Sequence, residues 1–178
     1  MELVVLLGET GEPIGTASKH DVHTDSTPLH LAFSCWLLGG DGRVLVTRRA
    51  LSKLTWPGVW TNSFCGHPAP GEAIADAITR RAETELGIQP AELVALQVAV
   101  SDFRYRAVDS SGIVENEVCP VYVARLQPGA TLRPNPDEVD SYAWVEPGAL
   151  ISSAEATPFA FSPWMIEELA DSGLRARL

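Results

Sequence analysis

The chain has 178 residues, of which 46% are hydrophobic and 20% charged, the composition of an ordinary globular protein with one sizeable core. Its net charge of −10 argues against nonspecific binding to nucleic acids or to anionic membranes. The sequence has no apolar run near the ~18 residues of a membrane span and no basic residue ahead of its first apolar run, so we expect a cytoplasmic protein without a signal peptide.

The first half of the chain alternates apolar strand-like segments with turns rich in Gly, Asp and Pro. Residues 8–15 have turn chemistry, residues 18–29 are polar and irregular, and residues 39–42 form a tight turn between two strands. The strands predicted here are residues 3–7, 30–38 and 43–49.

The clearest helix is predicted over residues 72–87. Its apolar stripe consists of Ile74, Ile78, Ala82 and Leu86, which recur at helical spacing, and Gly87 is a suitable C-cap.

The second half adds further strands and then a helical tail. From Pro147 onward the chain is predicted to form helical segments broken at Pro158 and Pro163. Strands and helices follow one another without a regular βαβ rhythm, so we predict a single α+β domain over residues 1–178, with a mixed β-sheet sandwiched between helices. The predicted strands are residues 93–100, 103–108, 113–126 and 139–145, with a loop at 127–138.

A cysteine, a glycine and a histidine stand together at Cys65, Gly66 and His67, directly before the predicted helix. The chain has three widely spaced cysteines, and without an export signal we expect Cys35, Cys65 and Cys119 to be free thiols.

A long spacing pattern links this motif to the helix. Gly66, Glu72, Arg80, Glu85, Gly87 and Ile88 follow an order that resembles the Nudix signature, in which glutamates on a loop–helix–loop bring divalent cations to a diphosphate. Two positions depart from the hydrolase form, because Arg81 and Thr84 stand where acidic residues are expected. Arg81 and Glu85 share a helix face, so they form either a surface ion pair or a site in which Arg81 grips a diphosphate and Glu85 holds one Mg²⁺.

Other metal-ligand residue types are scattered along the chain. His23, His30 and His67 have no zinc-finger spacing, so their spacing alone is weak evidence for a metal site. Glu115 and Glu117 say more, because alternate residues of a strand point to one face and two adjacent carboxylates need a cation or a raised pKa. An edge strand that faces water is the alternative.

Taken together, several stretches resemble the type I isopentenyl-diphosphate Δ-isomerases of the Nudix superfamily, over nearly the whole chain from about Leu3 to the last helix. They are "HLAFSCWL", "VTRRALSK", "WPGVWTNSFCGHP", "DFRYRA", "GIVENEVCPV" and "ATPFAFSPWM".

This resemblance implies a Nudix-like fold and the interconversion of isopentenyl diphosphate and dimethylallyl diphosphate by a 1,3-proton shift. It implies a Zn²⁺ or Mn²⁺ on the family's His₃Glu₂ set, and a separate Mg²⁺ that accompanies the diphosphate through Glu85. The catalytic positions it implies are Cys65, Glu117, Tyr105 and Trp164; those contacting the diphosphate are Lys19, Arg49, Lys53 and Arg81; and those holding the first metal are His23, His30, His67, Glu115 and Glu117.

Two other functions fit the same motifs. One is a Nudix hydrolase acting on a nucleotide or other diphosphate, against which the missing acidic residues weigh. The other is a noncatalytic binding protein on a Nudix fold, which would not need both members of an acid/base pair. For the isomerase we expect a monomer whose partners are its small-molecule substrates, with neither nucleic acid nor membrane.

Overall fold

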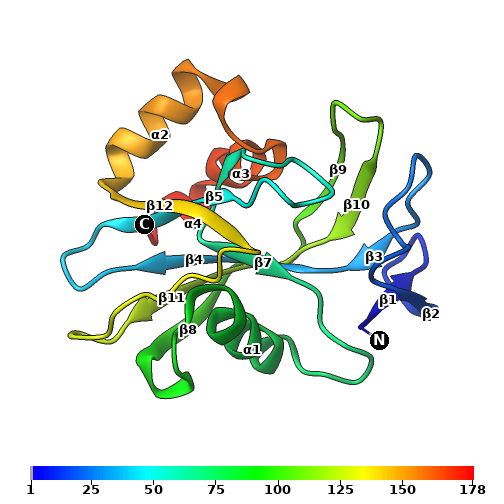
Figure 1. Ribbon diagram of the computed structural model, residues 1–178, viewed down its shortest axis with the longest axis horizontal. Coiled ribbons are helices and arrows are strands. Elements are labelled where there is room, and N and C mark those ends of the chain that lie inside the picture. The colour runs from blue at the N-terminus through cyan, green and yellow to red at the C-terminus, as the bar shows by residue number, and fades with distance from the viewer. Residues whose placement is uncertain (1) are drawn as a thin grey trace.

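The computed structural model describes residues 2–178, which form strands and helices in a mixed order (Figure 1). The helices are α1 (Ile74–Leu86), α2 (Pro147–Ala156), α3 (Pro163–Ala170) and α4 (Ser172–Arg175), with short 3-10 turns η1 (Pro90–Glu92) and η2 (Pro158–Ala160). The strands are β1 (Leu3–Leu7), β2 (Pro13–Ser18), β3 (His30–Leu31), β4 (Phe33–Leu38), β5 (Val44–Arg49), β6 (Trp60–Thr61), β7 (Phe64–Gly66), β8 (Leu93–Val100), β9 (Arg104–Val108), β10 (Val114–Val118), β11 (Val121–Leu126) and β12 (Val139–Val145).

The strands make two sheets. The five-stranded sheet has the order β2-β1-β3-β10-β9, and the seven-stranded sheet has the path β12-β5-β4-β11-β8, with β6 added to β5 and β7 to β4. In Figure 1, α1 lies on one side of the larger sheet, and α2 and α3 lie on the other side. The predicted α+β class and the arrangement of mixed sheet between helices are confirmed.

Two segments, β3 with β4 and β10 with β11, run from the smaller sheet into the larger one. β3 pairs with β10 in the smaller sheet and β4 pairs with β11 in the larger sheet, and both pairings are parallel. The hydrogen bonds continue through the crossing, since the Ala32 amide donates to the Val118 carbonyl at 2.9 Å and the Ser34 amide to the Pro120 carbonyl at 3.1 Å. These backbone hydrogen bonds therefore fix the position of one sheet relative to the other at the crossing.

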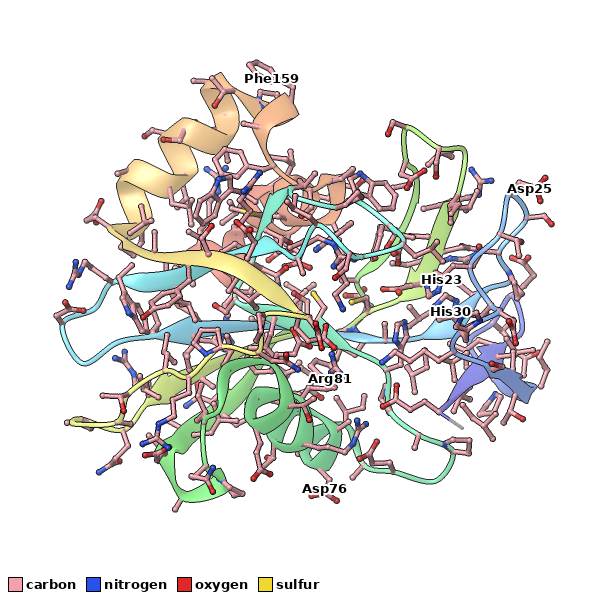
Figure 2. The ribbon with its side chains drawn as sticks, in the orientation of Figure 1. His23, Asp25, His30, Asp76, Arg81 and Phe159 are labelled. Carbon is pink, nitrogen blue, oxygen red and sulfur yellow. The ribbon has the colours of Figure 1, made fainter. Side chains whose placement is uncertain are left out.

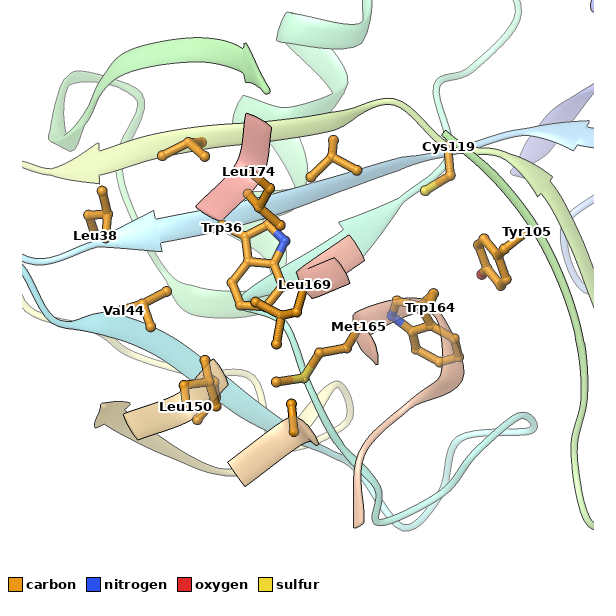
Figure 3. Close-up of a cluster of buried hydrophobic side chains, with 14 of the residues drawn as sticks. Trp36, Leu38, Val44, Tyr105, Cys119, Leu150, Trp164, Met165, Leu169 and Leu174 are labelled. Atoms are coloured by element: carbon orange, nitrogen blue, oxygen red, sulfur yellow. The ribbon is translucent and has the colours of Figure 1, made fainter. Parts of the chain in front are cut away.

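β4 is buried on both faces. Phe33 and Leu37 pack against the apolar stripe of α1, whereas Trp36 and Leu38 face the opposite way and pack with residues of α3. Figure 3 shows this second cluster, with Trp36 beside Leu169 of α3.

The helix prediction is confirmed at its apolar face and at its end. Ile78, Ala82 and Leu86 are fully buried, and Gly87 ends α1 in the left-handed conformation at φ 67°. The helix begins at Ile74, so Glu72 precedes it and binds Arg80 instead of opening the first turn.

Several local predictions differ from the structure. The strand expected over residues 113–126 is two strands in different sheets, interrupted at Cys119–Pro120, where proline has no amide to continue a ladder. Residues 13–15, expected as a turn, belong to β2, and His30 belongs to a separate two-residue strand rather than to the start of β4. The short strands β6 and β7 were not predicted, and Cys65 lies on β7.

Within residues 2–178, the helices all fall short of the length and apolarity that crossing a bilayer would require.

Candidate active site and metal centre

One cavity of about 820 Å³ lies where the two sheets meet α1 and α3. Its wall includes side chains from both sheets, from α1, from α3 and from the segment after β5. The predicted site residues that line it are Lys19, His23, Arg49, Lys53, Cys65, His67, Arg81, Glu85, Tyr105, Glu115, Glu117 and Trp164. His30 is fully buried behind this wall, in contact with His67 and Glu117.

Four predicted metal ligands converge beside β3 and β10. His23, His30, His67 and Glu117 offer ligand atoms that all lie within 4.8 Å of one another. Figure 2 shows His23 and His30 together beside the smaller sheet, although they come from the irregular segment before β3 and from β3 itself. Glu115 stands next to this group and outside it, with its Oε2 3.7 Å from His23 Nε2.

Strand pairing accounts for part of this convergence. Glu117 is the register partner of His30 on one side and of Tyr105 on the other. Side chains of paired residues stand on the same face of a sheet, so the carboxylate of Glu117 has an imidazole and a phenol as its neighbours. His67 reaches the group from just beyond β7, and its Nε2 lies 3.0 Å from Glu117 Oε1.

The chemistry of the four donors fits a divalent cation. His30 Nδ1 donates to the Pro28 carbonyl at 2.9 Å, which in the neutral ring leaves Nε2 as the free ligand atom. That Nε2 lies only 3.2 Å from His67 Nε2, and His23 Nε2 is buried without a hydrogen-bond partner among the described residues. Several ring nitrogens and a carboxylate aimed at one point are the donor set that transition metals prefer.

The two carboxylates of β10 differ in their proton affinity. Burial favours the protonated form of both, but the neighbouring imidazoles of His30 and His67 hold the pKa of Glu117 well below its usual range. Glu115 has no imidazole within hydrogen-bond distance, and burial together with the charge of Glu117 raises its pKa to about 8. The predicted shared face is therefore real, and the alternative of an edge strand facing water is wrong because both residues are buried.

Tyr105 and Thr55 complete the hydrogen bonding of these carboxylates. The Tyr105 hydroxyl lies 2.9 Å from Glu117 Oε2 and 3.3 Å from Glu115 Oε2. The Thr55 hydroxyl donates to Glu115 Oε1 at 2.8 Å. Each buried oxygen of the pair thus has a partner, which fixes the direction in which the carboxylates face the cavity.

Cys65 faces the cavity from the other sheet. It is partly buried on β7, and burial first and the charge of Glu168 second raise the pKa of its thiol well above the usual range. The thiol contacts the Asn62 side chain, with Sγ 3.3 Å from Oδ1 and 3.2 Å from Nδ2. Gly66 follows it because a Cβ there would lie 2.7 Å from Arg81 Cγ and 3.0 Å from Phe33 Cζ.

An aromatic wall connects the two sides of the cavity. The ring of Trp164 lies 5.7 Å from that of Tyr105 and 5.3 Å from that of Trp56, and the guanidinium carbon of Arg49 lies 5.5 Å from its centre. Figure 3 places Tyr105 and Trp164 side by side at one end of the buried cluster. An electron-rich face of this kind attracts a neighbouring cation.

The four predicted basic residues reach the same cavity and three of them already contact carboxylates. Arg81 binds Glu85 at 2.7 Å and Glu138 at 3.2 Å, Lys53 binds Glu138, and Lys19 binds Glu2 at 2.7 Å. Arg81 and Glu85 are 5% and 8% exposed, so the alternative of a surface ion pair is wrong.

Residues that sequence reasoning missed complete this geometry. Glu138 lies between Lys53 and Arg81, Thr55 holds Glu115, and Asn62 contacts Cys65. Asn62 had a usable signal, because it lies three residues before the cysteine of the same motif. Glu138 and Thr55 had no sequence signal, because each belongs to a polar loop that resembles the other loops of the chain.

Comparison with known proteins gives consistent matches along the chain. A family model described as the NUDIX domain matches residues 28–165. A protein of Leifsonia xyli subsp. xyli named isopentenyl-diphosphate Delta-isomerase is 62% identical, over 94% of this chain and 89% of the relative. A protein of the same name from Corynebacterium diphtheriae is 55% identical, over 100% of this chain and 97% of the relative.

Solved structures match at lower identity. The crystal structure of DR0079 from Deinococcus radiodurans superposes with a TM-score of 0.71 at 20% identity, covering 95% of this chain and 98% of that one. A MutT protein from Methanosarcina mazei Go1 gives a TM-score of 0.61 at 15% identity, covering 84% and 92% of the two chains. Identities this low establish the shared fold alone.

Proposed function

Because the chain belongs to the NUDIX domain family and, within it, to the isopentenyl-diphosphate Delta-isomerases, we propose that it interconverts isopentenyl diphosphate and dimethylallyl diphosphate. The reaction is a 1,3-allylic proton shift that moves one double bond. The observation that carries this proposal is that a thiol and a carboxylate from different sheets, Cys65 and Glu117, line one cavity with a cluster of basic residues.

The reaction requires an acid and a base at different carbons. Protonation of the terminal alkene carbon gives a tertiary cation, and loss of a proton from the methylene between the cation and the oxygen-bearing carbon gives the product. One group must release a proton and the other must take one, and both can act only if they flank the substrate. We propose that Cys65 and Glu117 perform one transfer each.

The surrounding residues have supporting roles in this proposal. The Tyr105 hydroxyl holds the Glu117 carboxylate at 2.9 Å, and the indole of Trp164 faces the cation as it forms, an interaction worth about 2 kcal/mol or more when water is absent. Trp56 packs edge-on against Trp164 and helps to exclude water that would capture the cation as an alcohol.

The basic residues bind the diphosphate in this proposal. Arg81, Lys53, Arg49 and Lys19 bring positive charge into a cavity of an otherwise acidic protein. An arginine fork and lysine point charges are the usual partners of phosphate oxygens. When substrate binds, these cations exchange part of their present contacts with Glu138 and Glu2 for contacts with the diphosphate.

We propose two metal sites for this chain. His23, His30, His67 and Glu117, with Glu115 beside them, would hold one Zn²⁺ or Mn²⁺, and Glu85 would hold the Mg²⁺ that accompanies the diphosphate. When bound, the first ion would fix the orientation and lower the proton affinity of Glu117, and the second would neutralise phosphate charge.

A hydrolase of nucleotide diphosphates is the weaker alternative, because Arg81 occupies a position where that chemistry places an acidic residue. We also propose that the enzyme acts as a monomer in the cytoplasm.

Isotope incorporation tests the proposed function. The protein is incubated with isopentenyl diphosphate and Mg²⁺ in deuterated water, and the products are analysed by NMR and mass spectrometry. We expect deuterium in the new methyl group of dimethylallyl diphosphate, and no phosphate release when nucleotides are supplied instead. Phosphate release without labelled dimethylallyl diphosphate would replace this proposal with the hydrolase.

A further inference from the structure

Asn62 occupies a buried position between Cys65 and Trp164. Its side chain is fully buried, and its Oδ1 accepts hydrogen bonds from Trp164 Nε1 at 3.1 Å and from the Thr61 hydroxyl at 2.8 Å. The same oxygen lies 3.3 Å from the Cys65 sulfur. One amide group therefore contacts both the thiol and the aromatic ring that face the substrate cavity.

The other end of the amide is tied to Ser34. Asn62 Nδ2 donates to the Ser34 hydroxyl at 2.8 Å and to the Phe64 carbonyl at 3.0 Å. With donors gathered at Oδ1 and acceptors at Nδ2, the network permits one orientation of the amide.

Glu168 determines the direction of the Ser34 hydroxyl. It is fully buried on α3, and its Oε2 accepts from Ser34 Oγ at 2.9 Å and from Trp36 Nε1 at 2.6 Å. Because the Ser34 hydrogen points to Glu168, a lone pair of the same oxygen is left to accept from Asn62. Glu168 and Trp164 lie one helical turn apart, so α3 holds the amide from two directions.

We propose that Asn62 is a positioning residue for the Cys65 thiol, and that Glu168 acts on it through Ser34. This inference rests on the proposed function, in which Cys65 carries one of the two proton transfers. A displacement of about 1 Å at a reacting group can lower the rate about 100-fold, so an amide that fixes Sγ relative to Trp164 controls turnover without touching the diphosphate.

The neutral form of Glu168 is sufficient for this role. Burial raises the pKa of Glu168 to about 8, so near neutral pH the carboxyl group keeps its proton and Oε2 acts as an uncharged acceptor. A glutamine offers the same carbonyl acceptor, whereas a leucine of similar size offers none.

Steady-state kinetics of variants test the positioning role. We expect Asn62→Ala to lower kcat about 100-fold, and Ser34→Ala or Glu168→Leu to lower it about tenfold, while KM for isopentenyl diphosphate stays within about twofold. Glu168→Gln should stay within about twofold of wild type in kcat. The exposed Glu167→Gln on the same helix is the matched control and should be unchanged.

The double variant tests the path through Ser34. If Glu168 acts through Ser34, Ser34→Ala combined with Glu168→Leu should have the kcat of either single variant. The inference would be overturned if the double variant lost kcat by the product of the two single losses, or if Asn62→Ala left kcat unchanged. If Glu168→Leu does not fold, Ser34→Ala and Glu168→Gln still decide it.

An NMR measurement tests the same chain of contacts without using activity. The side-chain amide hydrogens of Asn62, assigned by their loss in Asn62→Ala, should exchange about tenfold faster with solvent in Ser34→Ala and Glu168→Leu than in wild type or Glu168→Gln. Equal exchange in all four proteins would overturn the inference. Absence of isomerase activity in the wild type would instead refute the proposed function, and the exchange rates would still decide whether Glu168 holds Asn62.

Discussion

Replacing Arg81 by methionine should destabilise the protein far more than loss of an ordinary ion pair. Arg81 is 5% exposed and binds Glu85 at 2.9 and 2.7 Å and Glu138 at 3.2 Å. Its removal leaves the Glu85 carboxylate, itself 8% exposed, without its charge partner, and stranding one member of a buried pair costs about 3–5 kcal/mol. For a chain of this size that corresponds to a fall in Tm of about 6–20 °C.

Urea unfolding followed by circular dichroism measures this loss. Arg80→Met is the comparison on the same helix, because the 2.7 Å pair of Arg80 and Glu72 is only partly buried, with 39% and 19% of the two side chains exposed, so its loss should cost less than that of Arg81. Combining Arg81→Met with Glu85→Leu removes both charges and should recover most of the lost stability. A loss below about 1 kcal/mol for Arg81→Met, or no recovery in the double variant, would show that burial does not govern this pair.

The remaining predictions concern the thiol, the metal, the diphosphate and pH. Cys65→Ala should lower kcat by about 10²–10⁴-fold with near-normal folding. Because Cys65 is the one cysteine of the described residues that is not fully buried, mass-spectrometric mapping should find that an alkylating agent inactivates the enzyme there, slowly because the raised pKa leaves little thiolate, and that substrate protects it. Full activity after complete modification would exclude the thiol as acid or base. His67→Asn should lower the bound transition metal measured by plasma mass spectrometry without unfolding the domain, and unchanged metal content would exclude His67 as a ligand. Lys53→Ala should raise KM for isopentenyl diphosphate about tenfold, because a phosphate contact is lost, and wild-type kinetics would show that Lys53 does not contact the diphosphate. The pKa of Glu168 is raised to about 8 in the folded protein, so between pH 4.5 and 8 the folded state holds a proton that the unfolded state has lost. As pH rises through that window, the free energy of unfolding of the wild type should therefore fall, relative to that of Glu168→Gln, by roughly 1.4 kcal/mol per pH unit. Parallel pH profiles of the two proteins in urea titrations would contradict the raised pKa.

Local patterns predicted the elements that bury one continuous face. The stripe from Ile78 to Leu86 specified α1, and the alternating apolar residues specified most strands, because both signals depend on near neighbours in the chain. The break at Cys119–Pro120 was missed since the apolar run continues across it, and the change of sheet is set by partners that lie far away in sequence.

The site residues likewise fall into those that the sequence could predict and those that it could not. Motif residues such as Cys65 and Glu117 could be predicted because they lie in recognisable stretches. Glu138 and Glu168 could not, because a glutamate in a polar loop or on a short helix gives no sign that folding will place it against Lys53 or against Trp36. The spacing of Arg81 and Glu85 predicted that they meet, whereas their burial depends on packing that no local pattern encodes.

Glu117 pairs with both His30 and Tyr105, so the hairpin formed by β9 and β10 should tolerate insertions less well within β10 than at its turn. Side chains alternate between faces along a strand, so one residue added or removed between Glu115 and Glu117 would put the two carboxylates on opposite faces of the sheet. Residues added at the turn between β9 and β10, where the Gly112 amide bonds to the Asp109 carbonyl, would leave that alignment unchanged. The hairpin turn is therefore the place to attach a reporter or a fused peptide, and β10 is where natural and engineered variants must conserve length.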